Sequence, residues 1–100
     1  MEFQMSDEHY RLVFENSEDA ILITSPKGKI YRANQAACRL FLRTEEELCH
    51  AGRAGITDLG DPKLALAIQE RERRGKARKE LTFIKGDGSK FVADYTSALF

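Results

Sequence analysis

Two short turns that contain glycine constrain the fold of this chain more than any other feature. They are residues 25–29 (SPKGK) and residues 85–89 (KGDGS). Glycine and proline supply the backbone angles of a tight hairpin, and each turn lies between two runs rich in β-branched and aromatic residues. These four runs are residues 20–24, 30–33, 81–84 and 91–95. The sequence therefore predicts one β-hairpin near each end of the chain.

The segment that follows the first hairpin has helical periodicity. Asn34 is placed to cap a helix, because the apolar residues of 36–41 recur at the spacing of a buried helix face. Thr44 and Glu47 have the spacing of a capping box, which predicts the start of a second helix. Residues 49–60 contain three glycines, so we expect a loop or a single turn there.

Two further helices are predicted, one in the middle of the chain and one near its start. Asp61 followed by proline begins a helix that ends at Gly75. We expect its buried face to consist of Leu64, Ala67, Ile68 and Arg71. The N-terminal helix is expected over residues 6–16 with Ser6 as its cap, and residues 1–5 are expected to be an N-terminal extension.

The composition suits one small domain and excludes several functions. The chain has 100 residues, of which 42% are hydrophobic, so it can bury a single core. The 16 basic and 16 acidic residues give no net charge to attract nucleic acid or an anionic membrane, and no apolar run is long enough for a membrane span. Cys38 and Cys49 do not form a disulfide framework, so we expect a cytoplasmic location without membrane contact.

Four segments, taken in their order and spacing, carry a resemblance to a known family. They are residues 14–21 (FENSEDAI), 28–37 (GKIYRANQAA), 43–48 (RTEEEL) and 86–94 (GDGSKFVAD). In these segments the chain resembles a PAS domain, the sensory module of histidine kinases, cyclic-di-nucleotide enzymes and transcriptional regulators. The resemblance implies an α+β fold over residues 6–100, in which helices pack on one face of an antiparallel sheet.

The end of the chain departs from this family. A PAS sheet has five strands with the last at its centre, between the first and the fourth, whereas this chain reaches Phe100 where the fourth strand should end. The resemblance therefore implies either that the central strand is missing or that the first and fourth strands pair directly. We expect a piece of a longer protein, in which a partner chain or an N-terminal segment covers the exposed strand edges.

Members of this family carry flavin, haem, other ligands or none, and we expect neither flavin nor haem here. Phe83 and Ala93 stand where flavin-binding members have amide side chains, which read the polar edge of the ring. The helix of residues 61–74 has no histidine to serve as an axial haem ligand. Cys49 and His50 are adjacent, but no other cysteine or histidine lies near them in sequence, so no metal site is predicted.

A pocket between the sheet and the middle helices is the remaining candidate site. Strand alternation and helical periodicity turn a mostly apolar set inward, which suits a ligand pocket and a packed core equally well. The candidate lining residues are Leu22, Thr24, Leu40, Phe41, Leu64, Ile68, Phe83, Ala93, Tyr95 and Ser97. Arg53 is a weaker candidate that either meets a carboxylate ligand or pairs with Asp58 or Asp61, and the pairing is the favoured interpretation.

No set of residues predicts catalysis, since the chain has no Ser-His-Asp arrangement and no phosphate loop. The basic residues of 71–79 are interrupted by glutamate, which is typical of a solvated helix end rather than of a nucleic-acid surface. We predict a sensory module of a larger prokaryotic signalling protein, such as a two-component histidine kinase or a cyclic-di-nucleotide enzyme. It would relay a small-molecule or conformational signal to an effector domain in the same chain.

The alternative is a module that binds no ligand and serves for dimerisation or protein interaction. The outward face of the sheet, together with the N-terminal helix, offers an apolar surface for a homodimer. Its residues are Tyr10, Val13, Phe14, Ile21, Ile23, Ile84 and Val92.

Overall fold

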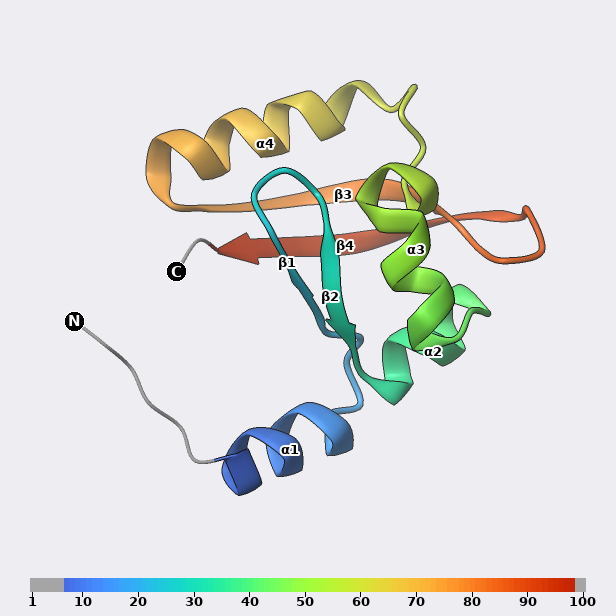
Figure 1. The fold of residues 1–100 in the computed structure, drawn as a ribbon. Coiled ribbons are helices and arrows are strands. Elements are labelled where there is room, and N and C mark those ends of the chain that lie inside the picture. Colours follow the sequence, from blue (N-terminus) through green and yellow to red (C-terminus); the bar gives the residue numbers. More distant parts are fainter. Residues whose placement is uncertain (1–6, 99–100) are drawn as a thin grey trace.

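The computed structural model describes residues 7–98, so the predicted extension over residues 1–5 and the cap at Ser6 lie outside the described part. Its elements are α1 (Asp7–Asn16), β1 (Leu22–Thr24), β2 (Ile30–Ala33), α2 (Gln35–Phe41), α3 (Glu45–Ile56), α4 (Pro62–Arg74), β3 (Lys76–Ile84) and β4 (Lys90–Ala98). Figure 1 shows α4 running along β3 and α3 packed beside β2, with α1 at the opposite end of the molecule from α4. The predicted α+β class is confirmed.

Both predicted hairpins are present. Gly28 (φ 99°) and Gly88 (φ 88°) adopt the left-handed backbone that each turn requires. Strand β3 pairs with β4 along its whole length, from Lys76 opposite Ala98 to Ile84 opposite Lys90. Lys76 therefore begins a strand, so the assignment of the basic residues at 76–79 to a helix end is wrong, whereas α4 does end at Gly75. Pairing with a distant strand outweighs the local charge pattern.

The two hairpins form two separate two-stranded sheets, β1-β2 and β3-β4. Strands β1 and β4 are not paired with each other within residues 7–98. Of the two arrangements left open by the sequence, direct pairing of the first and fourth strands is therefore wrong. Each of these strands has one edge without a strand partner in the described part of the chain.

Helix α3 corrects the prediction of a loop over residues 49–60. The capping box of Thr44 and Glu47 is present as predicted, but the helix continues to Ile56 across a kink at Gly52 (φ 67°, ψ 178°). Just after the kink, the backbone N–H of Arg53 donates to the carbonyl of Gly28 at 2.8 Å. These tertiary contacts, with Ile56 only 1% exposed, offset the helix-breaking tendency of glycine.

The core lies between the hairpins and helices α2–α4. Its most deeply buried side chains include Ile30, Leu48, Ile56 and Leu81, and Phe41 and Phe83 belong to the same cluster. Helix α4 has the predicted cap at Asp61 and ends at Gly75 in the left-handed conformation. Its predicted inner face is confirmed, because Ala67 and Arg71 are buried and Leu64 and Ile68 are half-buried.

The position of α1 shows that one residue of the predicted dimer surface is buried within the chain itself. Phe14 is only 3% exposed, stacks on Tyr10 with ring centroids 5.2 Å apart, and is covered by the Arg32 guanidinium at 5.1 Å. Its assignment to an interaction surface is therefore wrong, because side chains of the same chain already cover the ring. Val13 and Val92 remain 62% and 60% exposed.

Glu45 joins β2 to α3 and makes the stability of this contact dependent on pH. One carboxylate oxygen accepts hydrogen bonds from the Ala33 N–H and the Arg32 guanidinium, each at 2.9 Å, and these bonds lower the pKa of Glu45. A lowered folded-state pKa stabilises the fold above the ordinary value of 4.5, and the stabilisation is lost as the pH falls below it. We expect Glu45→Gln to show a smaller loss of unfolding free energy than the wild type between pH 6 and pH 3 in urea titrations. A Glu46→Gln control, at an exposed position one residue later, should retain the wild-type loss, and equal losses in both variants would contradict this role.

Candidate functional site

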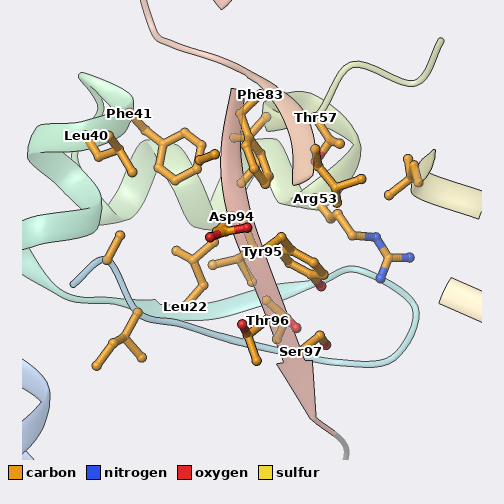
Figure 2. A pocket seen from close by; sticks show the side chains of 18 of the residues that line it. Leu22, Leu40, Phe41, Arg53, Thr57, Phe83, Asp94, Tyr95, Thr96 and Ser97 are labelled. Carbon is orange, nitrogen blue, oxygen red and sulfur yellow. The ribbon is translucent and has the colours of Figure 1, made fainter. Parts of the chain in front are cut away.

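A cavity of about 490 Å³ lies between the hairpins and helices α2–α4 (Figure 2). Every residue of the predicted pocket set except Ile68 lines it, and Arg53 lines it as well. The prediction is wrong for Ile68. Helix α4 runs along β3, so Leu64, in the first turn of the helix, is the residue of α4 that reaches the cavity. Ligand binding in this space stays a prediction.

One part of the cavity wall is aromatic. Phe41 of α2 meets Phe83 of β3 edge to face, with ring centroids 5.7 Å apart and planes at 86°. Phe91 lies 5.6 Å from both rings, and Tyr95 lies 6.2 Å from Phe83. Figure 2 shows Phe41 and Phe83 toward one end of the cavity and Arg53 on the other side of Tyr95. The wall therefore has an apolar end and a more polar end.

The polar end is built on the turn of the first hairpin. The guanidinium Nη1 of Arg53 donates to the carbonyl of Pro26 at 3.4 Å. Gly28 permits this approach, because a Cβ there would lie 3.2 Å from the Arg53 side chain. The favoured pairing of Arg53 with Asp58 or Asp61 is wrong. The turn lies closer to the arginine than either carboxylate, and both carboxylates have other partners.

Those other partners explain why the two aspartates are not free for Arg53. Asp58 accepts from the Gly60 N–H at 2.9 Å and pairs with Lys90 at 3.2 Å, and these contacts lower its pKa. Asp61 caps α4 through the Lys63 N–H and also accepts from the Thr82 N–H at 3.0 Å. The bond from Lys63 is the main cause of its lowered pKa. The Asp61 carboxylate therefore joins α4 to β3, and the Asp58 carboxylate joins the loop before α4 to β4.

Thr57 is a lining residue that the sequence did not indicate. It follows α3, pairs as an isolated bridge with Phe83 and is 1% exposed. Its hydroxyl Oγ1 is buried and has no hydrogen-bond partner among the described residues. A buried hydroxyl without a partner is costly, so Thr57 places an unsatisfied polar group in the wall of the cavity.

Two segments contribute consecutive residues to the lining, namely residues 20–24, which end with strand β1, and residues 93–97 of strand β4. Because alternate side chains of a strand point to opposite faces, a consecutive series means that the strand edges border the space. The cavity is therefore continuous with the gap between the two hairpins. Ile21 and Ile23, predicted to face outward for a dimer, border this gap instead. The lining residues outside the predicted set are Ala20, Ile21, Ile23, Pro26, Ile30, Ile56, Thr57, Leu81, Phe91, Asp94 and Thr96.

Some of these additional lining residues could have been predicted from strand alternation, and others could not. Leu81 and Phe91 share the alternation of Phe83 and Ala93, which turns all four to the same side of the hairpin. Thr57 and Pro26 lie outside the strands, where no periodic pattern reports which way a side chain points.

The two cysteines lie away from this site. Cys38 is half-buried, and its burial raises the pKa of its thiol. Cys49 is half-buried and donates to the carbonyl of Tyr31, while His50 is exposed. Within residues 7–98 no group of three or more His, Cys, Asp or Glu is arranged to hold a metal ion. None of the described helices has the length and hydropathy that a bilayer crossing requires.

Comparison with known proteins identifies the family to which this architecture belongs. A sequence model of the PAS domain matches residues 18–100. The chain belongs to the PAS domain family. This PAS domain is 36% identical over 104 residues to sporulation kinase E of Bacillus subtilis, a match that covers 97% of the chain and 13% of the kinase. The domain is a sensory module of signal transduction.

Solved structures show the same fold. A domain of a sensory box sensor histidine kinase/response regulator from Geobacter sulfurreducens has a TM-score of 0.77 at 22% identity, over 93% of this chain and 82% of that one. A PAS domain from Colwellia psychrerythraea has a TM-score of 0.78 at 21% identity, over 89% of this chain and 77% of that one.

Proposed function

We propose that this PAS domain binds a small molecule in the cavity and relays its presence to an effector domain in the same chain. The observation that carries this function is a cavity of about 490 Å³ with mostly apolar walls and a few polar groups, which is the composition of small-molecule sites. The similarity to sporulation kinase E supports a kinase as the effector. We propose neither flavin nor haem as the ligand. A cytoplasmic location is part of the proposal, supported by the free cysteines Cys38 and Cys49.

The side chain of Asn34 offers a route from the cavity to α1. Its Oδ1 accepts from the N–H of Ile21, which borders the cavity, and its Nδ2 donates to the carbonyl of Phe14 in α1. A ligand that contacts residues 20–24 therefore acts on a segment that shares one buried side chain with the N-terminal helix. It shifts the domain only if it binds two arrangements of this connection with different affinity.

Native mass spectrometry of the freshly purified protein tests ligand binding. We expect a bound mass that is lost on denaturation. Ala93→Leu, which places three further carbon atoms at a lining position, should reduce the bound fraction at least about tenfold while the protein stays folded. Val92→Leu is the matched control, because Val92 is the adjacent residue and is 60% exposed. A fully bare wild-type protein, or equal occupancy in both variants, would count against a ligand cavity.

A homodimer is the second candidate function, and the exposure of Val13 and Val92 favours it. We expect Val92→Glu to convert the dimer to a monomer in sedimentation experiments while the single chain stays folded, because the side chain is exposed in the single chain. Val92→Thr, which keeps the shape of the side chain, should retain most of the dimer. A monomeric wild-type protein would refute this candidate.

A further inference from the structure

We propose that the polar end of the cavity is a binding site for the carboxylate group of an amphipathic small molecule, held by Arg53, by the positive charge of the adjoining Arg71 and by the hydroxyl of Thr57. This inference rests on the proposed function, since it names the class of ligand for the same cavity. The ligand is identified by the charge and hydrogen-bond donors that the wall leaves without partners.

Two guanidinium groups meet at one oxygen atom. Arg53 of α3 reaches the carbonyl of Pro26 through Nη1 at 3.4 Å, and Arg71 of α4 reaches the same oxygen through Nη2 at 2.9 Å. Two positive charges this close repel each other, and away from bulk water the repulsion is strong. Neither arginine forms an ion pair with a carboxylate in residues 7–98. The pair therefore carries two positive charges that no described acidic side chain balances.

Arg71 makes this imbalance costly, because the residue is only 3% exposed. Its Nε is buried and has no hydrogen-bond partner in the described part of the chain. A guanidinium withdrawn from water is stabilised by an anion and poorly by a single neutral carbonyl. The hydrogen bond to the hairpin turn uses only one of the Arg71 donors. It does not explain why Arg53 approaches the same carbonyl.

The surroundings select an amphipathic carboxylate. Pro26, Arg53 and Thr57 all line the cavity. Arg71 does not line it, but its guanidinium shares the Pro26 carbonyl with Arg53, so its charge lies directly behind the wall. The buried Thr57 hydroxyl is a further donor in the same wall. A planar carboxylate matches the paired donors of a guanidinium. Asp94, the acidic residue of the lining, lies within 3.5 Å of Arg78 on the exposed side of β4. The rest of the wall is aromatic and aliphatic and suits an apolar body.

Isothermal titration of the whole chain with octanoate, 1-octanol and inorganic phosphate tests the site. We expect octanoate to bind at least about tenfold more tightly than 1-octanol, which has the same chain and no charge. Arg53→Gln and Arg71→Gln should each reduce the affinity for octanoate to that for 1-octanol. Arg73→Gln is the control, because Arg73 is exposed on the same helix as Arg71, and it should leave both affinities unchanged.

Thr57→Val separates a ligand contact from a structural role. Replacing an unpartnered buried hydroxyl with a methyl group should raise Tm by about 4 °C while it weakens octanoate binding. A purely structural residue would not move these two quantities in opposite directions. If the Arg71→Gln variant does not fold, the Arg53→Gln and Thr57→Val variants decide the question, because Arg53 is only half-buried.

Equal affinities for octanoate and 1-octanol would overturn the carboxylate site and leave ligand binding in the cavity in place. Phosphate binding that is lost in Arg53→Gln, without a preference for octanoate, would also overturn it. Absence of binding by all three probes would refute this inference alone, because native mass spectrometry judges the proposed function independently.

Discussion

Asn34→Ala is expected to lower the free energy of unfolding by about 3–5 kcal/mol, a large part of the stability of a domain of this size. Asn34 is fully buried, and its Oδ1 accepts from the N–H groups of Ile21 (3.0 Å) and Ala37 (2.9 Å). Its Nδ2 donates to the carbonyls of Phe14 and Asp19, both at 3.0 Å. Truncation leaves four backbone groups from three segments without partners, and each loss adds to the cost.

Urea unfolding measures this effect, and two further variants define it. Asn16→Ala removes one exposed hydrogen bond, from Asn16 Nδ2 to the Leu12 carbonyl, and should cost less than about 0.5 kcal/mol. Asn34→Asp keeps the acceptor but loses the donor, so hydrogen exchange should increase in α1 more than in α2. A loss below about 1 kcal/mol for Asn34→Ala would contradict a central role for this side chain.

Gly86→Ala is expected to cost about 3 kcal/mol although the residue is exposed on the surface. The N–H of Gly86 donates to the carbonyl of Phe41 at 2.7 Å, which fastens the turn of the second hairpin to the end of α2. A Cβ at this position would overlap the carbonyl oxygen of Leu42. Because the obstacle is backbone, and Leu42 is itself held in the left-handed conformation at φ 53°, it has little freedom to move away.

Gly88→Ala is the matched control in the same turn. Gly88 has φ 88° and no atom within 4 Å of the position of a Cβ, so the variant has only the cost of left-handed backbone, about 1 kcal/mol. Thermal unfolding of both variants measures the difference. Equal losses would mean that the contact between the turn and α2 does not limit the substitution.

The features that depend on a few neighbouring residues were predictable from the amino-acid sequence. The capping box of Thr44, the cap at Asn34 and the left-handed end of α4 at Gly75 were all predictable, because each is a hydrogen bond or backbone angle formed within a few positions. The two hairpins were predictable for the same reason. Strand alternation also placed Phe83 among the residues that line the cavity.

How these elements meet became visible in the tertiary structure. It extended α3 past Gly52, began β3 at Lys76 and left a gap between the two hairpins. It also brought Arg53 and Arg71, which lie on different helices, to one carbonyl of the first hairpin. These outcomes depend on contacts between residues far apart in the chain. Their energies are decided by which surfaces pack together, and no local pattern of residue types reports that.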